Sequence, residues 1–146
     1  MGSRNPKPII SRDVLQQLAE TRFKEANALY KAGYFHGAIY TAGYAVECWL
    51  KVAICARLDW DELYDTFKEH DLNFLLLHSG LFRPMKEVLK VLSSFVQISG
   101  MWFWDRGTEL RYCTPDLYGE DQAKDFLQWV SNETEGVVPW IRAQAS

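Results

Sequence analysis

Residues 34–58 read YFHGAIYTAGYAVECWLKVAICARL, and this stretch decides the fold. Apolar residues recur along it at helical spacing, at Ile39, Ala42, Val46, Leu50 and Ala53. Further apolar side chains widen this face until little of the surface is left for water. The pattern therefore predicts one long helix that is buried on nearly all sides.

A narrow polar stripe interrupts this apolar helix. It consists of Tyr40, Tyr44, Glu47 and Lys51, stepped by four, three and four residues. A carboxylate inside an apolar core is costly unless it is paired or hydrogen-bonded. Two interpretations follow: Glu47 pairs with Lys51 one turn later, or it orients Arg111 across the bundle so that the guanidinium faces a phosphate. Both predict a buried Glu47 with a cationic partner.

Helices are also expected on either side of this segment. Ser11 is a good N-cap for a first helix that Gly33 would end. Asp71 would cap a short helix over 72–78, closed by Gly80. The acidic linker between them, residues 59–70, is expected to be at most partly helical.

Two more helices are expected in the second half of the chain. Pro84 suits the first turn of a helix that continues to Gly100. Residues 101–119, MWFWDRGTELRYCTPDLYG, lack helical periodicity and predict a long aromatic-rich loop, a feature that is often functional. The last helix would begin at about Asp121, with Gly136 and Pro139 ending or kinking it. No strand pattern is visible, so the prediction is an all-α, up-and-down bundle of about five helices.

Length and composition set further limits. A chain of 146 residues can bury roughly 70% of its unfolded surface in one domain, here 11–146 after an irregular lead-in at 1–10. The net charge of −3 gives no general attraction to nucleic acid. Cys48, Cys55 and Cys113 lack metal-like spacing, so we expect no metal and no cofactor. Without a leader or a membrane-length apolar run, a cytoplasmic protein with no membrane contact is expected.

The sequence resembles the HEPN domain, a family of small helical bundles. The resemblance is carried by residues 29–52, LYKAGYFHGAIYTAGYAVECWLKV, by HDL at 70–72 and by ELRY at 109–112, and it covers about residues 12–130. Within it, the segment GYAVECWLK at 43–51 is the most specific part. The resemblance implies a setting in toxin–antitoxin, defence or RNA-processing systems, and often a nucleotidyltransferase as partner.

Active HEPN domains resemble metal-independent ribonucleases that use an Arg followed four to six residues later by a His, across a dimer interface. Here the corresponding segment runs from Arg106 to Tyr112, and Arg111 stands where the His would be. The nuclease motif is therefore absent as written. Family members without it resemble nucleotide-binding or interaction modules.

Arg106 and Arg111 lie five residues apart among aromatic residues. Arginine and aromatic side chains together can hold a nucleotide by charge and stacking, but the same composition is typical of protein interfaces. We favour the interface because no basic cluster surrounds them. His70 is best explained as the residue before a helix cap, and a role as general base would require a nearby nucleophile.

These observations predict a non-catalytic HEPN-type module that forms a homodimer and binds a partner protein, and a nucleotide or RNA as well. The candidate ligand-binding residues are Glu47, Lys51, His70, Arg106, Arg111 and Tyr112. The alternative is a divergent ribonuclease in which Arg106 and Arg111 stabilise the pentacoordinate phosphate. In that case His70, or the 2′-hydroxyl chemistry of the RNA itself, would replace the missing base.

Overall fold

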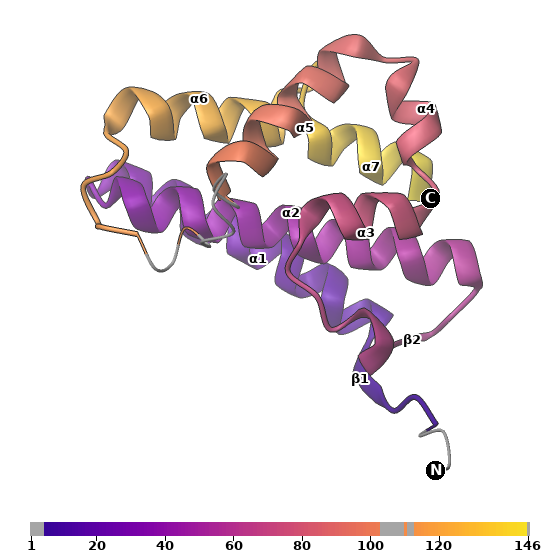
Figure 1. Ribbon diagram of the computed structural model, residues 1–146. Helices are drawn as coiled ribbons and strands as arrows, with labels where there is room; N and C mark the ends of the chain where they lie inside the picture. Colours follow the sequence, from indigo (N-terminus) through magenta and orange to yellow (C-terminus); the bar gives the residue numbers. More distant parts are fainter. Residues whose placement is uncertain (1–4, 103–109, 111–112, 146) are drawn as a thin grey trace.

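A computed structural model shows an all-α helical bundle, which confirms the predicted fold class (Figure 1). The structure describes residues 5–102, 110 and 113–145. Within these residues there are seven α-helices rather than about five, one 3₁₀ turn and a two-stranded sheet. The candidate residues Arg106, Arg111 and Tyr112 lie outside the described part of the chain.

Helices α1 (Arg12–Lys31) and α2 (Phe35–Leu58) form a hairpin, packed side by side along their length (Figure 1). Ser11 caps α1 as predicted, because its hydroxyl accepts a hydrogen bond from the backbone N–H of Val14 at 3.2 Å. Gly33 ends it with φ of 86°, a conformation that glycine adopts without strain. The backbone N–H of Tyr34 then bonds to the carbonyl of Leu29 at 2.9 Å, so the chain reverses within residues 32–34.

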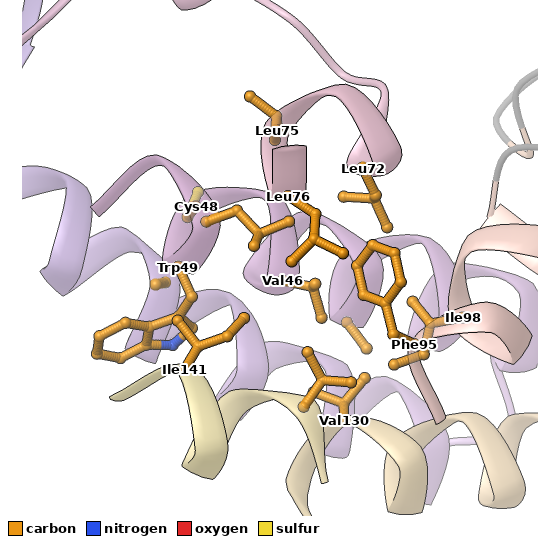
Figure 2. Close-up of a cluster of buried hydrophobic side chains, with 14 of the residues drawn as sticks. Val46, Cys48, Trp49, Leu72, Leu75, Leu76, Phe95, Ile98, Val130 and Ile141 are labelled. Atoms are coloured by element: carbon orange, nitrogen blue, oxygen red, sulfur yellow. The ribbon is translucent and has the colours of Figure 1, made fainter. Parts of the chain in front are cut away.

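Helix α2 is the centre of the bundle, as its sequence predicts. It contacts α1, α3 (Leu72–Ser79), α5 (Leu89–Trp102), α6 (Glu120–Ser131) and α7 (Val137–Ala145). Figure 2 shows Val46 of α2 among Leu72 and Leu76 of α3 and Phe95 of α5. Such close packing of apolar side chains supplies most of the favourable free energy of folding.

The strands were not predicted from the sequence. β1 (Pro8–Ser11) pairs antiparallel with β2 (Glu62–Tyr64), and a 3₁₀ turn at Asp65–Phe67 follows. The prediction that residues 1–10 form an irregular lead-in is therefore wrong for residues 8–10. These strands have four and three residues, which is too short to show an alternating pattern in the sequence. They form because the two segments pair with each other.

The helix expected from Pro84 to Gly100 is two helices. α4 (Phe82–Lys86) ends in a tight turn, where the N–H of Val88 bonds to the carbonyl of Met85 at 2.9 Å, and α5 begins beyond it. This turn redirects the chain so that both Met85 and Phe95 are buried. The sequence pattern would allow one continuous helix, but burial of Met85 and Phe95 favours the break.

The end of the chain also holds two helices. Asn132 follows α6, and its Oδ1 accepts backbone N–H groups from Thr134 and Glu135, both at 3.0 Å. This turn leads into α7, which carries Pro139 in its first turn, where a missing N–H costs little. The predicted interruption near Gly136 and Pro139 is confirmed, and a separate helix follows it.

Candidate functional site

The Glu47 side chain lies in the core with both carboxylate oxygens engaged. The residue is 1% exposed. Its Oε2 lies 3.0 Å from Nζ of Lys51, and its Oε1 lies 2.8 Å from Nδ1 of His70. The prediction that Glu47 is buried with a cationic partner is confirmed. We refer to Glu47, Lys51 and His70 as the buried-acid site.

Two helices bring these three residues together. Lys51 lies one turn after Glu47 on α2, so an ion pair between them needs only helical geometry. His70 comes from the linker, immediately before Asp71, whose carboxylate caps α3 by accepting the N–H of Asn73 at 3.0 Å. The cap therefore fixes both the start of α3 and the position of the imidazole over α2.

The apolar face of α3 holds this start against α2. Leu72, Leu75 and Leu76 are at most 2% exposed, and Figure 2 shows all three on α3 above Val46. The position of His70 is thus determined by core packing as well as by its hydrogen bond to Glu47.

The hydrogen bond to Glu47 determines which nitrogen of His70 carries a proton. A carboxylate can only accept, so Nδ1 must donate its hydrogen to Oε1 of Glu47. Nε2 then lies on the far side of the ring from the carboxylate, and 44% of the His70 side chain is exposed. The Lys51 side chain, by contrast, is 9% exposed. The buried-acid site therefore presents one imidazole edge to solvent above a neutral, buried ion pair.

A thiol and a phenol lie beside this site on α2. Burial, followed by the nearby Glu47 carboxylate, raises the pKa of Cys48 to about 12. Burial also raises the pKa of Tyr44, with Cys48 and Glu47 adding to the effect, and the Arg22 guanidinium lies 5.8 Å from the Tyr44 ring centroid. Cys48 is therefore a protonated thiol at neutral pH and a poor nucleophile.

Trp102 of α5 packs on Tyr40 in the neighbouring part of α2. Trp102 is the last described residue of α5 and is buried, although the sequence placed it in the loop. Its ring stacks on Tyr40 with centroids 6.1 Å apart, and its Nε1 donates to the Tyr40 carbonyl at 3.0 Å. The indole lies over Gly43, where any Cβ would collide with it. Gly43 therefore serves close packing between helices, one turn before Glu47.

A polar bond joins the start of α3 to the end of α5. Nδ2 of Asn73 donates to Oγ of Ser99 at 2.8 Å. Both helix ends thus lie over the middle of α2. Leu110 is also buried.

Of the six predicted ligand-binding residues, the structure brings Glu47, Lys51 and His70 together. The proposed pairing of Glu47 with Arg111 falls outside the described residues and remains a prediction. The contact between His70 and Glu47 was not predicted, because 23 residues separate them and no short-range pattern relates them. Among the described residues, no group of three His, Cys, Asp or Glu side chains could hold a metal ion.

Comparisons with known proteins give the chain no relative. No protein-family model matches it, and neither characterised proteins nor solved structures yielded a match. Within the described residues, no helix has the length and apolar character required to cross a membrane.

Proposed function

We propose that this chain is a non-catalytic HEPN-type binding module whose binding surface is centred on His70. The observation that carries the proposal is the 2.8 Å contact between His70 Nδ1 and the buried Glu47 carboxylate. Burying a charged group without a partner would be costly, and here the carboxylate holds a half-exposed imidazole in one orientation. A fixed imidazole edge above a buried ion pair is an arrangement suited to binding rather than to packing alone.

The ligand that suits this edge is a phosphate group of a nucleotide or an RNA. The charges of Glu47 and Lys51 cancel, so a protonated His70 leaves the site with one positive charge. An imidazolium Nε2–H donates a charge-assisted hydrogen bond to a phosphate oxygen. We propose that Arg106 and Arg111 add further phosphate contacts and Tyr112 a stacking ring, which is the nucleotide interpretation that the sequence leaves open beside a protein interface.

The resemblance to HEPN domains agrees with this placement. Glu47 and Lys51 belong to GYAVECWLK, and His70 begins HDL, so the two resembling segments supply the whole buried-acid site. Under the proposal the setting is a defence or toxin–antitoxin system, with a nucleotidyltransferase-like protein as one partner.

We include a homodimer in the proposal. Several large apolar side chains on α3, α4 and α5 are exposed by 41–72%: Leu77, Phe82, Leu89 and Val96. We propose that these side chains form one contiguous apolar patch, which is the kind of surface that another protein covers. Light scattering after gel filtration would give the mass of a dimer, and a monomeric mass at micromolar concentration would contradict this part.

The binding proposal is tested with a labelled single-stranded RNA and fluorescence anisotropy, with unlabelled ADP as competitor. His70→Gln removes the imidazole, and Lys124→Gln removes one charge from an exposed position on α6 as a control. We expect His70→Gln to weaken binding about tenfold, the value of one charge-assisted hydrogen bond. Equal affinities for wild type, His70→Gln and Lys124→Gln would refute the proposal.

One observation favours the alternative function, a divergent metal-independent ribonuclease. The pairing of Glu47 with His70 leaves Nε2 as the free base of the neutral ring, with its orientation fixed by a carboxylate. Nε2 could take the proton of an RNA 2′-hydroxyl, whose oxygen then attacks the adjacent phosphorus. The bond to the 5′ oxygen breaks as that oxygen takes a proton back from Nε2, so a 2′,3′-cyclic phosphate and a 5′-hydroxyl remain and the ring is neutral again.

The ribonuclease alternative requires its own test. RNA is incubated with the wild type in a chelator, beside Arg111→Ala and His70→Ala. Cleavage by the wild type that is lost in both variants would establish it. Intact RNA in every sample would exclude it and leave the binding function.

A further inference from the structure

Three arginines line hollows at the C-terminal end of α7, away from the buried-acid site. Arg12 begins α1, Arg57 lies in the last turn of α2 and Arg142 lies on α7. They line two hollows of about 470 and 460 Å³ that have Arg12 and Ala145 in common. Hollows of this size are within the range that holds small ligands. In Figure 1 the end of α7 lies beside α4, near the end of α3.

Two of these arginines are held in place by uncharged partners. The Arg142 guanidinium lies 5.3 Å from the centroid of the Trp49 ring. Nη1 of Arg57 donates to the carbonyl of His78 at 2.8 Å, and its side chain passes close to Gly80. Neither contact neutralises the charge, and each guanidinium retains free N–H donors.

Carboxylates are missing from the lining of both hollows, as far as the described residues show. The ion pairs between described residues also leave out all three arginines. Arg12 also lines a third hollow, together with four acidic residues: Asp13, Asp59, Asp61 and Glu62. Arg57 and Arg142 do not line that third hollow. Among the described residues, Arg57 and Arg142 thus have no carboxylate as ion-pair partner, in a protein whose net charge is −3.

The position of the two hollows on α2 separates them from the buried-acid site. Trp49, Val52, Ala53 and Ala56 line them from α2. At 100° per residue these positions are rotated about 140–240° from Glu47, which places them on the opposite face of the helix. A ligand here would therefore bind independently of one at His70.

We propose that these two hollows form a binding site for a small diphosphate compound, with Arg12 shared between the two phosphate groups. Arg142 would hold the phosphate in the first hollow and Arg57 the phosphate in the second. Guanidinium groups suit this task because their planar N–H pairs match two oxygens of one phosphate. Gln16 and Gln144 supply neutral amide donors at the edge. The Trp49 ring is already covered by Arg142, so the site recognises phosphates rather than a base.

Isothermal titration calorimetry with pyrophosphate, ADP and adenosine tests this site on the full chain. We expect saturable binding of pyrophosphate and of ADP with similar affinity, and no binding of adenosine. Arg12→Gln and Arg142→Gln should each weaken pyrophosphate binding about tenfold, whereas Arg142→Lys, which keeps the charge, should lose less. Lys24→Gln, an exposed position on the same helix as Arg12, is the charge-matched control and should bind like wild type.

Three results would overturn the proposal. The first is no saturable binding of pyrophosphate by the wild type. The second is an equal loss in Lys24→Gln and Arg12→Gln, which would indicate a general charge effect. The third is adenosine binding as tightly as ADP. Circular dichroism of each variant verifies that it is folded. Arg12 is partly exposed at the start of α1, so Arg12→Gln gives a second, independent test if Arg142→Gln loses its structure.

Discussion

Replacing Glu47 by glutamine should destabilise the protein by about 3–5 kcal/mol, the usual result of removing one partner from a buried ion pair. Glu47 is 1% exposed and the Lys51 side chain 9% exposed, so water cannot replace the lost carboxylate. The glutamine Oε1 can still accept a hydrogen bond from the Lys51 ammonium, but it carries no charge, so the ammonium is left buried without a counter-charge. The His70 side chain is 44% exposed and can turn to water, so the cost comes mainly from Lys51.

Urea unfolding followed by tryptophan fluorescence measures this change as a lower midpoint at constant slope. A double variant, Glu47→Leu with Lys51→Met, removes both charges and so tests whether the loss comes from leaving Lys51 unpaired. Replacing a whole buried pair by apolar residues is often neutral, so the double variant should recover most of the loss. A loss below about 1 kcal/mol in Glu47→Gln is what an exposed pair gives, and it would refute the reasoning. So would a double variant less stable than the single one.

Three further changes test other parts of the structure by the same unfolding assay. Gly43→Ala would place a Cβ 2.6 Å from Cγ of Trp102 and should lower the free energy of unfolding by about 1–3 kcal/mol. Gly100→Ala, which has open space around it, should raise the free energy of unfolding by up to about 1 kcal/mol. Equal effects of the two changes would contradict the close packing at Gly43. The pKa of Cys48 is raised from 9.0 to about 12 in the folded protein, so between these pH values the thiol ionises only in the unfolded state. The free energy of unfolding should therefore fall by about 1.4 kcal/mol per pH unit as the pH rises from 9 toward 12. Cys48→Ala should lack this part of the fall, and identical pH profiles would contradict the buried thiol. Asp71→Ala removes the cap of α3 and should cost about 1 kcal/mol, and no change would show that the cap is not needed.

Much of the helical framework could be predicted from local patterns. The Ser11 cap, the Gly33 stop, the long apolar α2 and the Asp71 cap each depend on residues within a few positions of one another. Such features follow from helix geometry and from the conformational freedom of glycine. The ion pair between Glu47 and Lys51 is local in the same sense.

Features that depend on distant partners were missed. The two short strands stabilise each other across more than 50 residues, and the break between α4 and α5 serves the burial of both Met85 and Phe95. The bond from His70 to Glu47 likewise depends on how α3 packs on α2. Sequence periodicity reports which face of a helix is buried but not which helix covers it.

The orientation of His70 is central to the proposed binding function, and long-range ¹H–¹⁵N NMR of the imidazole measures it directly. In the free wild type with a neutral ring, we predict a proton on Nδ1 and none on Nε2. Addition of RNA or ADP should shift the Nε2 resonance toward that of a protonated nitrogen, because the bound phosphate accepts the Nε2–H of the imidazolium. Glu47→Gln should lose this tautomer preference. A neutral ring protonated on Nε2 in the free protein, or an Nε2 resonance that does not respond to either ligand, would contradict the central claim that Glu47 holds His70 for binding.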